Sequence, residues 1–585
     1  MSASSVTTTL DALRAAPVRW QERAADTGVV QQLQHELALG STIARILAAR
    51  GVDSTRQAKK YLAPSLHDLP DPDGFAGMER AVDRLTHAVR TGQTVGVFGD
   101  YDVDGVTATT LLAEFLEALD VPTVFTIPNR LTEGYGMSRP GVDRLRGQGA
   151  RLIVAVDCGI TNHEEIDYAT AAGMDVIVVD HHRVGPDLPK ATAVINPHRP
   201  DCGRGGQHMC AVAVTFNVCM ALRRVLREKG FFQRRPEPNL GRFFDLVALG
   251  TVADVMPLVQ DNRILVHWGI RHIGQGRRPG MRALVHAADI PLERVSCGTL
   301  GFHLAPRVNA AGRLDDAAEA VRLLKTADWQ RACALAEQLD DHNRRRRELE
   351  SEITEQAARR IEQDPQLRDS RILIVADETW HPGVVGIVAS RLVDRFGRPT
   401  LVIGAGGKGS GRSIPAFHLH EAVLTVREHL VGFGGHAHAV GVSLKQGHFA
   451  VFRDTLIAYA AQRLTPEDLG KTLLYDGVLQ PEQVSLELAE VLQQAAPFGR
   501  GNPQGVFRFN NVRCRNVRLL KGAHLKGMLH GDQKLPFIAF GLGEKQPLLD
   551  APVDLLASVT INEWQGRRDA QLQVVDMAPS GRHQG

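Results

Sequence analysis

Three carboxylates stand on alternate residues at the end of an apolar run, in Gly99-Asp100-Tyr101-Asp102-Val103-Asp104-Gly105. Carboxylate oxygens in such a cluster suit divalent cations such as Mg²⁺ or Mn²⁺. A calcium loop of the EF-hand type shares the D-x-D-x-D-G start, but it requires a glutamate at its twelfth position, where this chain has Leu111. An ordinary solvated turn stays open for this run taken alone, because Asp and Gly are common turn residues.

Two further apolar runs also end in an acid. Asp157 follows LIVAV, and Asp180 follows DVIVV and precedes His181 and His182. Charges of one sign at one place repel, so the arrangement becomes stable if divalent cations neutralise it. Two such cations can bind a phosphodiester, activate a water and stabilise the leaving oxygen, and a neighbouring histidine can donate a proton or a hydrogen bond to the phosphoryl group. The pattern therefore predicts metal-dependent hydrolysis of a phosphate ester.

The elements that must position these residues follow from the hydrophobic pattern. Between Thr94 and Asn196, short β-branched runs alternate with helix-like stretches, which predicts a parallel sheet wrapped by helices and a ligand site beyond the carboxyl ends of its strands. A stretch from about Ala327 to Gln363 has neither Gly nor Pro and predicts one long helix. A second α/β segment begins at Arg371, and short strands after Gly470 indicate a small β-barrel. The expected domains are an N-terminal helical segment (1–75), a metal-binding domain (76–320), the long helix (321–365), a second α/β domain (366–465) and an OB-like barrel (466–585).

Composition limits the class of protein. The chain has 585 residues and 43% apolar residues, enough for several cores, and it shows neither a leader pattern nor a run of about 18 apolar residues, so we expect neither export nor a membrane anchor. Its seven cysteines contain no CxxC pair, which favours reduced thiols in a cytoplasm. A zinc site around Cys202, His208 and Cys210 is disfavoured because the spacing matches no usual pattern.

Attraction to nucleic acid must be local, because the formal net charge is only +2. From Val491 to Gly531 there is no acidic residue, whereas seven Arg and Lys side chains accumulate there. Either a DNA-binding face or a solvated strand accounts for this stretch. Phe507, Phe509 and Phe537 could stack on bases, although a place in the barrel core is favoured by their apolar neighbours.

The segments DYDVDG, VDCG, DHH and TVADVMPL resemble, in order and rough spacing, the four motifs of the DHH phosphoesterase family. The resemblance implies two divalent cations, Mn²⁺ or Mg²⁺. Their implied ligands are Asp102, Asp104, Asp157, His181 and Asp254. His182 would lie close to the scissile phosphate, with Asp100 in a supporting catalytic role. Phe98 stands where many relatives carry a histidine.

Other segments are similar to the exonuclease branch of this family. Ala305–Arg313 resembles the motif after the metal domain, and Pro497–Pro503 resembles the start of the barrel domain. Lys408–Ser413 and Gly434–Gly441 resemble the DHH-associated domain, whose glycine-rich backbone and arginine suit a phosphate. The substrate-binding residues implied are Arg307, Asn309 and Arg313, then Ser410, Arg412 and Arg130 around a terminal 5′ phosphate, and Gly435 and His436 at the end nucleotide.

The expected function is a 5′ to 3′ exonuclease that hydrolyses single-stranded DNA to mononucleotides in DNA repair and recombination, with the direction taken from the family. Two alternatives stay open: a phosphodiesterase for short oligonucleotides or cyclic dinucleotides, and an inactive DNA-binding scaffold. The resemblance also implies a monomer in the cytoplasm, with single-strand binding protein and a helicase as partners.

Overall fold

The chain divides into two compact units in a computed structural model that describes residues 18–129, 133–204, 208–314, 316–531 and 534–581. Unit 2 consists of Ala25–Asn343 with Glu490–Gln504, and unit 1 consists of the N-terminal residues to Ala24 with Arg344–Ala489 and Gly505–Gly585. Each unit is a body with its own cores.

A five-stranded parallel sheet is the centre of unit 2, as the alternating runs predict. Its strands, in the spatial order β3-β2-β4-β5-β6, are β3 (Thr123–Thr126), β2 (Val95–Gly99), β4 (Leu152–Val156), β5 (Asp175–Val179) and β6 (Ala193–Ile195). Strands β2 and β4 are buried along their whole length, which explains why their sequences are apolar without alternation.

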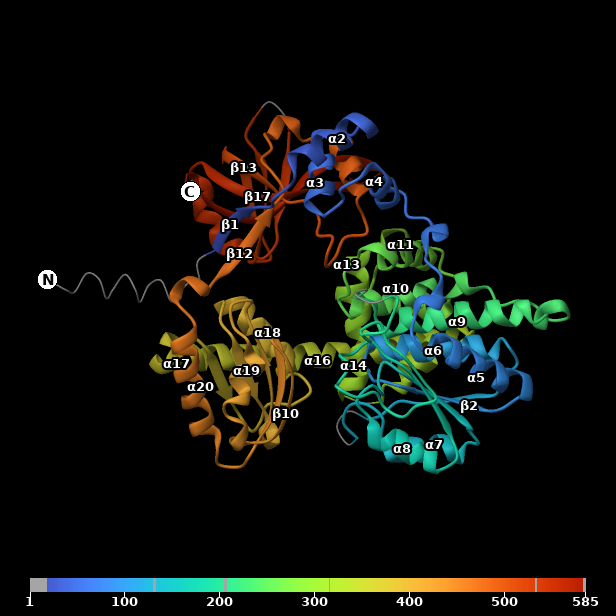
Figure 1. The fold of residues 1–585 in the computed structure, drawn as a ribbon. Coiled ribbons are helices and arrows are strands. Elements are labelled where there is room, and N and C mark those ends of the chain that lie inside the picture. The colour runs from blue at the N-terminus through green and yellow to red at the C-terminus, as the bar shows by residue number, and fades with distance from the viewer. Residues whose placement is uncertain (1–17, 130–132, 205–207, 315, 532–533, 582–585) are drawn as a thin grey trace. The chain divides into compact units, whose positions relative to one another are not determined.

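Helices cover both faces of this sheet (Figure 1). One face packs against α5 (Met78–Thr91), α6 (Val103–Glu117) and α9 (Ala211–Glu228), and the other against α7 (Arg139–Gly147) and α8 (His163–Ala171). Further helices extend the first layer: α10 (Phe244–Ala253), α11 (Gln260–Gly274), α12 (Pro279–Ala287), α14 (Ala305–Leu314) and α15 (Ala318–Lys325). The N-terminal part of the unit adds α2 (Thr27–Leu37), α3 (Ser41–Ala49) and α4 (Thr55–Leu62).

The expected long helix is present as α16 (Trp329–Gln363), which passes from unit 2 into unit 1 along the chain. Within unit 1 its C-terminal half buries Ile353, Ala357 and Ile361 against a second α/β sheet. That sheet has the order β10-β11-β9-β8-β7, with β7 (Leu373–Ala376), β8 (Thr400–Ile403), β9 (Lys408–Arg412), β10 (Leu430–His436) and β11 (Ala439–Leu444). Helix α18 (Val385–Phe396) packs on the same face as α16, while α19 (Leu419–Leu424) and α20 (Phe449–Arg463) share the core of the other face.

The barrel expected near the C-terminus is a six-stranded sheet with the order β13-β17-β18-β16-β15-β14. These strands are β13 (Phe507–Val512), β14 (Cys514–Leu520), β15 (His524–Leu529), β16 (Pro536–Ala539), β17 (Val553–Trp564) and β18 (Arg567–Pro579). Phe507, Phe509 and Phe537 are buried in this sheet's core, in agreement with the favoured interpretation.

The N-terminal segment differs from the all-helical expectation. Val18–Glu22 forms β1, which pairs in parallel with β12 (Lys471–Tyr475), and Trp20 Nε1 donates a hydrogen bond to Asp576 Oδ2 at 2.8 Å. A five-residue strand whose partner lies some 450 residues later cannot be recognised from local sequence, because its pairing is entirely non-local.

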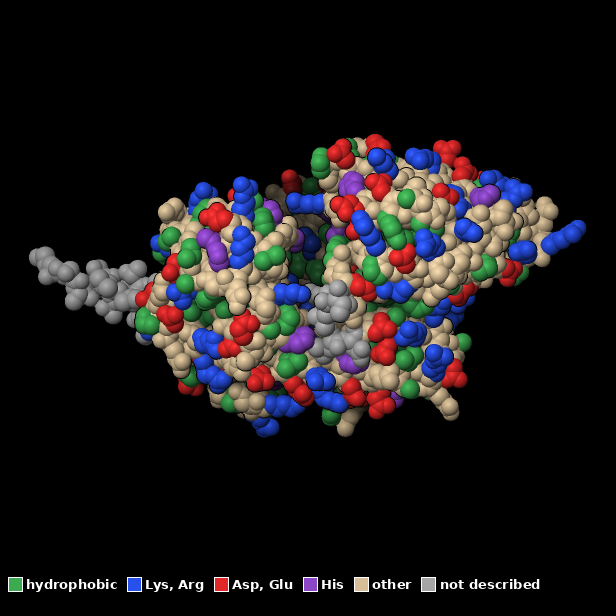
Figure 2. Space-filling model, turned by 90° about the horizontal axis from the view of Figure 1, so that it is seen from below, with side chains coloured by type: hydrophobic (Ala, Val, Ile, Leu, Met, Phe, Trp, Pro, Cys, Tyr) green, Lys and Arg blue, Asp and Glu red, His purple; other side chains and the backbone are tan. Residues whose placement is uncertain are grey.

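Figure 2 shows one face of the molecule, on which acidic and basic side chains are interspersed. This distribution is in keeping with the small net charge. None of the helices in the described ranges has both the length and the apolar character that crossing a bilayer requires.

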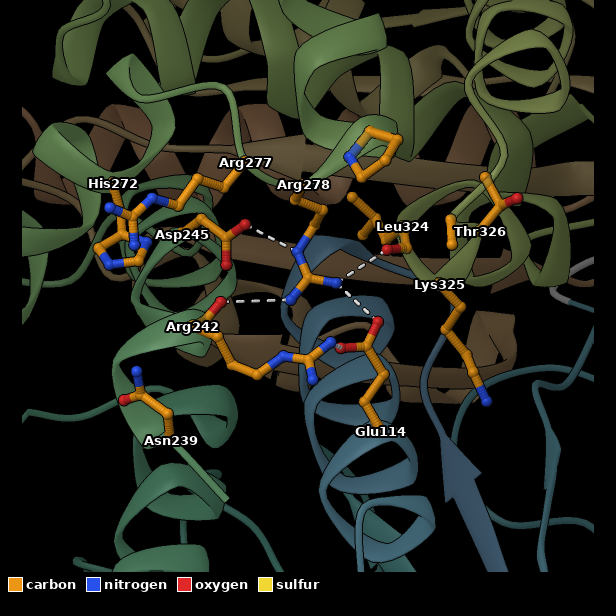
Figure 3. Close-up of a pocket in the computed structure, with 12 residues that line it drawn as sticks. Glu114, Asn239, Arg242, Asp245, His272, Arg277, Arg278, Leu324, Lys325 and Thr326 are labelled. Carbon is orange, nitrogen blue, oxygen red and sulfur yellow. Dashed lines mark hydrogen bonds and ion pairs between the residues drawn. The ribbon is translucent and has the colours of Figure 1, made fainter. Parts of the chain in front are cut away.

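A buried arginine joins three helices of unit 2 at a cavity of about 170 Å³ (Figure 3). Arg278 Nε lies 2.7 Å from Asp245 Oδ2 at the start of α10, and its Nη1 lies 2.6 Å from Glu114 Oε1 near the end of α6. The same guanidinium also donates to the carbonyl of Leu324 on α15 at 2.9 Å. The opposite ends of α6 and α10 carry Asp104 and Asp254, so this network fixes the two helices that deliver part of the predicted metal site.

Replacing Arg278 with methionine should lower the free energy of unfolding by about 3 to 5 kcal/mol, because it leaves the buried Asp245 without its counter-charge and leaves the buried Glu114 with only the exposed Arg242. The measurement is thermal and urea unfolding of the full chain. The matched control is Arg242→Met, since Arg242 also contacts Glu114 but its side chain is 55% exposed; its cost should stay below about 1 kcal/mol. Equal losses in the two variants would contradict this assignment.

Candidate metal centre

Three acids follow neighbouring strands of the unit 2 sheet. Asp100 comes after β2, Asp157 after β4 and Asp180 after β5, and all three are at most 2% exposed. Because parallel strands end at the same edge, their carboxylates meet where ligand sites of such sheets lie. Asp157 has a positive φ of 63°, a backbone strain that costs of order 1 to 3 kcal/mol and is typical of functional sites.

Asp102 and Asp104 are held at the start of α6. Asp102 is the N-cap and accepts hydrogen bonds from the amides of Asp104 and Gly105 at 2.9 and 3.1 Å. Asp104 is buried and accepts from the amides of Ala211 and Val212, at the first turn of α9, at 2.5 and 2.8 Å. A side chain at Gly105 would lie 2.4 Å from the Asp100 carbonyl oxygen, so this tight loop requires glycine.

His181 lies among three of the acids. Its Nε2 is 3.2 Å from Asp157 Oδ1, 3.6 Å from Asp254 Oδ2 and 3.7 Å from Asp104 Oδ2. Burial, together with the neighbouring His182, lowers the pKa of His181 to about 4 despite these acids. The imidazole is therefore neutral at physiological pH and offers a lone pair, which is the form that binds a metal.

His182 is oriented by the acid two residues before it. Its Nδ1 lies 2.7 Å from Asp180 Oδ1, and the same oxygen accepts from the amides of His181 and His182. Burial opposes a charge on His182, but the hydrogen bond and negative charge of Asp180 outweigh it and raise the pKa of His182 to about 9. Burial likewise opposes ionisation of Asp180, yet its bonds to His182 lower its pKa to about 2. The pair is thus an imidazolium held by a carboxylate at neutral pH.

The remaining acid, Asp254, caps the C-terminal end of α10. Together the residues form three groups in which one atom of each side chain lies within 4.8 Å of the others: Asp157 with His181 and His182, Asp104 with His181 and Asp254, and Asp100 with Asp102 and Asp157. Asp157 Oδ1 and Asp254 Oδ2 are buried and accept no hydrogen bond from the described residues. Buried acceptors without donors are costly, so this set of oxygens and imidazole nitrogens fits divalent cations.

Mutual repulsion marks the same acids. Burial first, and then neighbouring carboxylates, raise the pKa of Asp104 to about 7 and that of Asp254 to about 8, and raise the pKa of Asp157 well above its usual value. Several ionised carboxylates therefore do not coexist here without cations. Phe98, the position at which the family resemblance implies a histidine in many relatives, is fully buried in the core that includes Val142 and Leu145 of α7 and offers no ligand atom.

Two of the residues expected to bind the terminal phosphate lie on the second α/β sheet, in unit 1. Ser410 and Arg412 lie on β9 and point to the same place, because a methyl group added to Gly386 would be 3.3 Å from Ser410 Oγ and 3.4 Å from Arg412 Nη2. Gly386 is in the first turn of α18, where the positive end of the helix dipole favours an anion. Gly435 and His436 end β10, and Gly435 has a φ of 136° with the Ala439 carbonyl 2.2 Å from any added side chain.

Arg307, expected to bind substrate, makes its contacts with other residues of unit 2. Arg307 lies on α14, is 12% exposed, contacts Asp340 at 2.8 Å and donates to the His303 carbonyl at 2.7 Å. Asn309 and Arg313 are half-buried on the same helix, which packs on the acid loop so closely that Gly312 leaves no room for a side chain beside the Tyr101 carbonyl. Arg130 lies outside the described residues.

Two contributors to the centre were not recognised from the sequence. Tyr135 hydroxyl donates to the Asp157 carbonyl at 3.3 Å and lies 3.1 Å from His182 Nε2. The amides of Ala211 and Val212 hold Asp104. Every residue except proline has a backbone amide, so the residue types give no sign that these two amides are donors to the site. For Tyr135 the available signal was an aromatic residue between two glycines in Gly134-Tyr135-Gly136.

Comparison with known proteins gives matches along most of the chain. The DHH family, N-terminal domain, matches residues 94–251, the DHHA1 domain matches residues 369–462, and the RecJ OB domain matches residues 475–576. Single-stranded-DNA-specific exonuclease RecJ of Escherichia coli (strain K12) is 37% identical over 92% of this chain and 95% of its own length. The protein of the same name from Thermus thermophilus is 34% identical over 89% of this chain and 73% of its own length.

Solved structures agree with these matches. The crystal structure of RecJ in complex with Mn²⁺ from Thermus thermophilus superposes with a TM-score of 0.82 at 31% identity, covering 96% of this chain and 79% of the other. The Mg²⁺ complex of RecJ from the same organism has a TM-score of 0.76 at 29% identity, covering 96% and 78%. By the extent of these similarities, this chain belongs to the RecJ family of DHH proteins.

Proposed function

We propose that this protein is a metal-dependent 5′ to 3′ exonuclease that hydrolyses single-stranded DNA to mononucleotides in DNA repair and recombination. The observation that carries the proposal is the convergence of acids and imidazoles at one sheet edge, with buried oxygens of Asp157 and Asp254 that lack donors among the described residues. RecJ relatives at 33% to 38% identity, whose names state single-stranded-DNA-specific exonuclease activity, supply the substrate class.

In this proposal Asp102, Asp104, Asp157, His181 and Asp254 hold two divalent cations, Mn²⁺ or Mg²⁺. Bound cations of this kind bind the phosphodiester, activate water and stabilise the leaving oxygen. The protein contributes rigidity: two α9 amides fix Asp104, and two α6 amides fix Asp102. Asp100 supports the loop from the end of β2.

His182 serves as the proton-bearing group at the scissile phosphate. Its Nδ1 is engaged by Asp180, so the ring is held in one orientation and keeps its charge at neutral pH. An imidazolium can donate a hydrogen bond or a proton where negative charge develops on a phosphoryl or leaving oxygen. Asp180 acts through His182 as a positioning residue.

In this proposal Ser410 and Arg412, beside the first turn of α18, bind the terminal 5′ phosphate, and Arg130 is a further ligand expected from the family resemblance alone. An arginine fork, a hydroxyl and helix amides are a complementary set for a phosphate dianion. Gly435 and His436 would face the end nucleotide, and Asn309 and Arg313 would contact the strand from α14. Arg307 would position α14, because its charge is used by Asp340.

The test is digestion of 5′-labelled and 3′-labelled single strands in the presence of Mn²⁺, each with a 5′ phosphate or a 5′ hydroxyl. We expect immediate release of the 5′ label as mononucleotide, and a preference for the 5′ phosphate that Arg412→Gln lowers, because the substitution removes a positive charge that this proposal assigns to the phosphate.

Early release of the 3′ label would overturn the direction. Efficient cleavage of dinucleotides with no shortening of long strands would instead support a short-oligonucleotide phosphodiesterase, and binding without cleavage would support a scaffold.

The proposal extends to the setting of the reaction. We place it in the cytoplasm because all seven cysteines are free thiols, as expected in a reducing compartment. A monomer, a helicase that supplies single strands and single-strand binding protein as partners are proposed from the family.

A further inference from the structure

Residues 490–504, here named the return segment, fall within the expected range of the barrel domain in the sequence. In the structure they belong to unit 2. The buried Arg263 of α11 holds this segment by donating to the carbonyls of Ala495 at 3.1 Å and Ala496 at 2.8 Å. The same guanidinium donates to the Tyr61 carbonyl at 2.8 Å, so it joins the end of α4 to the return segment. Arg263 also donates to the Pro497 carbonyl at 3.4 Å, so three of the four carbonyls on this buried arginine belong to the return segment and fix its backbone.

A second set of contacts fixes the tip of the segment. Asn502 is fully buried and donates to the carbonyls of Ala495 and Pro497, both at 2.8 Å, while Tyr61 hydroxyl bonds to its side-chain oxygen. The amide of Leu258 donates to the Arg500 carbonyl at 2.7 Å. Leu258 is four residues after Asp254, so the backbone of Arg500 is anchored beside the chain that carries a proposed metal ligand.

The side chain of Arg500 is exposed at this anchored position. Its Nη1 makes one long contact, 3.4 Å to the carbonyl of Val255, the residue next to Asp254. A hydrogen bond of that length is weak. Support of the Val255 loop is therefore a poor explanation for a charged side chain at this position.

Other arginines of the chain show what a structural role looks like. Arg278 is 8% exposed and bound to two carboxylates, and Arg508, eight residues after Arg500, is 12% exposed and lies 2.9 Å from Asp554. Arg500 differs because its backbone is rigid while its guanidinium is open to solvent at the rim of an acid-rich centre. A guanidinium that is exposed to solvent on a rigid stretch of backbone is suited to bind an anionic ligand from solution.

We propose that Arg500 binds a backbone phosphate of the substrate strand at the edge of the metal centre. The inference rests on the proposed function, in which the strand carries one negative charge per nucleotide to this edge. A guanidinium fork can engage two oxygens of one phosphate, which would fix the register of the strand relative to Asp254 and reduce the repulsion between the strand and the acids.

The first experiment measures kcat and KM for a 5′-phosphorylated strand in Mn²⁺ over a range of NaCl concentrations, with the full-length wild type, Arg500→Gln, Arg500→Lys and Arg90→Gln. Arg90 is an exposed arginine in the last turn of α5, just before β2 begins and therefore at the sheet edge opposite the acids. We expect Arg500→Gln to lower kcat/KM about 10- to 100-fold. It should also reduce the slope of log kcat/KM against log salt by about 0.7, the value for one lost phosphate contact on a single strand.

Arg500→Lys should keep the salt slope and recover part of the rate, because it keeps the charge and loses the fork. Equal rates and slopes in Arg500→Gln and Arg90→Gln would overturn the inference. A lower rate with an unchanged salt slope would overturn it too, since Arg500 would then act through the protein. If neither wild type nor Arg90→Gln shortened any strand, the proposed function itself would fail.

A second experiment identifies the phosphate. Strands with one uncharged methylphosphonate linkage, placed in turn at each of the first positions from the 5′ end, are compared in wild type and Arg500→Gln. We expect one linkage whose neutralisation slows wild type but adds nothing to the loss in Arg500→Gln, the non-additivity of a direct contact. Additive losses at every linkage would exclude a phosphate contact by Arg500.

Discussion

Asp157→Asn should reduce Mn²⁺-dependent release of mononucleotides about 10³-fold or more, which corresponds to about 4 kcal/mol of lost transition-state stabilisation. The reason is its shared position: Asp157 belongs to two of the three groups that could hold a metal, one with His181 and His182 and one with Asp100 and Asp102. Asparagine keeps the shape of the side chain but removes its charge and one anionic oxygen. The measurement is the initial rate of nucleotide release, with Mn²⁺ affinity from calorimetry.

The same substitution should raise the melting temperature of the metal-free protein, because it removes one of several buried, mutually repelling carboxylates. A loss of activity with a stabilised fold separates a functional from a structural defect. The matched control is Asp167→Asn, an exposed acid on α8 of the same unit, which should keep full activity. An active Asp157→Asn protein would contradict the proposed metal centre.

Mn²⁺ affinity should fall on the order of 10²-fold or more between pH 8.5 and pH 6. Burial, reinforced by neighbouring carboxylates, raises the pKa of Asp104 to about 7 and that of Asp254 to about 8 in the metal-free protein. At pH 6 both groups carry protons that a cation must displace, whereas at pH 8.5 both are largely ionised. Calorimetry at pH 7 in two buffers with different ionisation enthalpies should detect proton release on Mn²⁺ binding.

The stability of the metal-free protein should have the opposite pH dependence. A carboxyl whose folded pKa is raised binds more protons in the folded state than in the unfolded state, so it favours folding at low pH. For these acids that contribution declines as the pH rises from about 4 to about 8. Added Mn²⁺ should therefore raise the melting temperature more at pH 8.5 than at pH 6. An Mn²⁺ affinity that is constant over this range would show that the acids are ionised without the metal.

The strands of the unit 2 sheet were predictable because each is a short apolar run that can be recognised from neighbouring residues alone. The acids Asp100, Asp157 and Asp180 could be assigned to one edge for the same reason, since parallel topology brings strand ends together. The long helix α16 was likewise visible from its composition, which includes neither Gly nor Pro, and its C-terminal half buries Ile353, Ala357 and Ile361 in unit 1. The apolar runs, the residues at their ends and the stretch without Gly or Pro were therefore enough to predict most of the fold and the position of the acid cluster.

The parts that were missed depend on contacts between distant residues. Strand β1 is defined only by its pairing with β12, and the amides that hold Asp104 belong to residues 107 and 108 positions later. The sequence places Arg500 within an acid-free stretch that indicates the barrel, yet the contacts of Arg263 and Asn502 bring it to the other unit. Such placements follow from tertiary hydrogen bonds, which no local pattern records.

The return segment also constrains how the chain can be made. Arg263 and the carbonyl of Pro497 are 234 residues apart, so a ribosome adding roughly 5 to 20 residues per second needs on the order of 10 to 50 s to supply the partners of this arginine. During that interval Arg263 of α11 has the Tyr61 carbonyl as an acceptor, but its acceptors at Ala495, Ala496 and Pro497 do not yet exist. Unit 2, although it begins at Ala25, can therefore reach its finished form only after the whole second α/β domain has been synthesised. Its completion is tied to synthesis of the chain beyond residue 500.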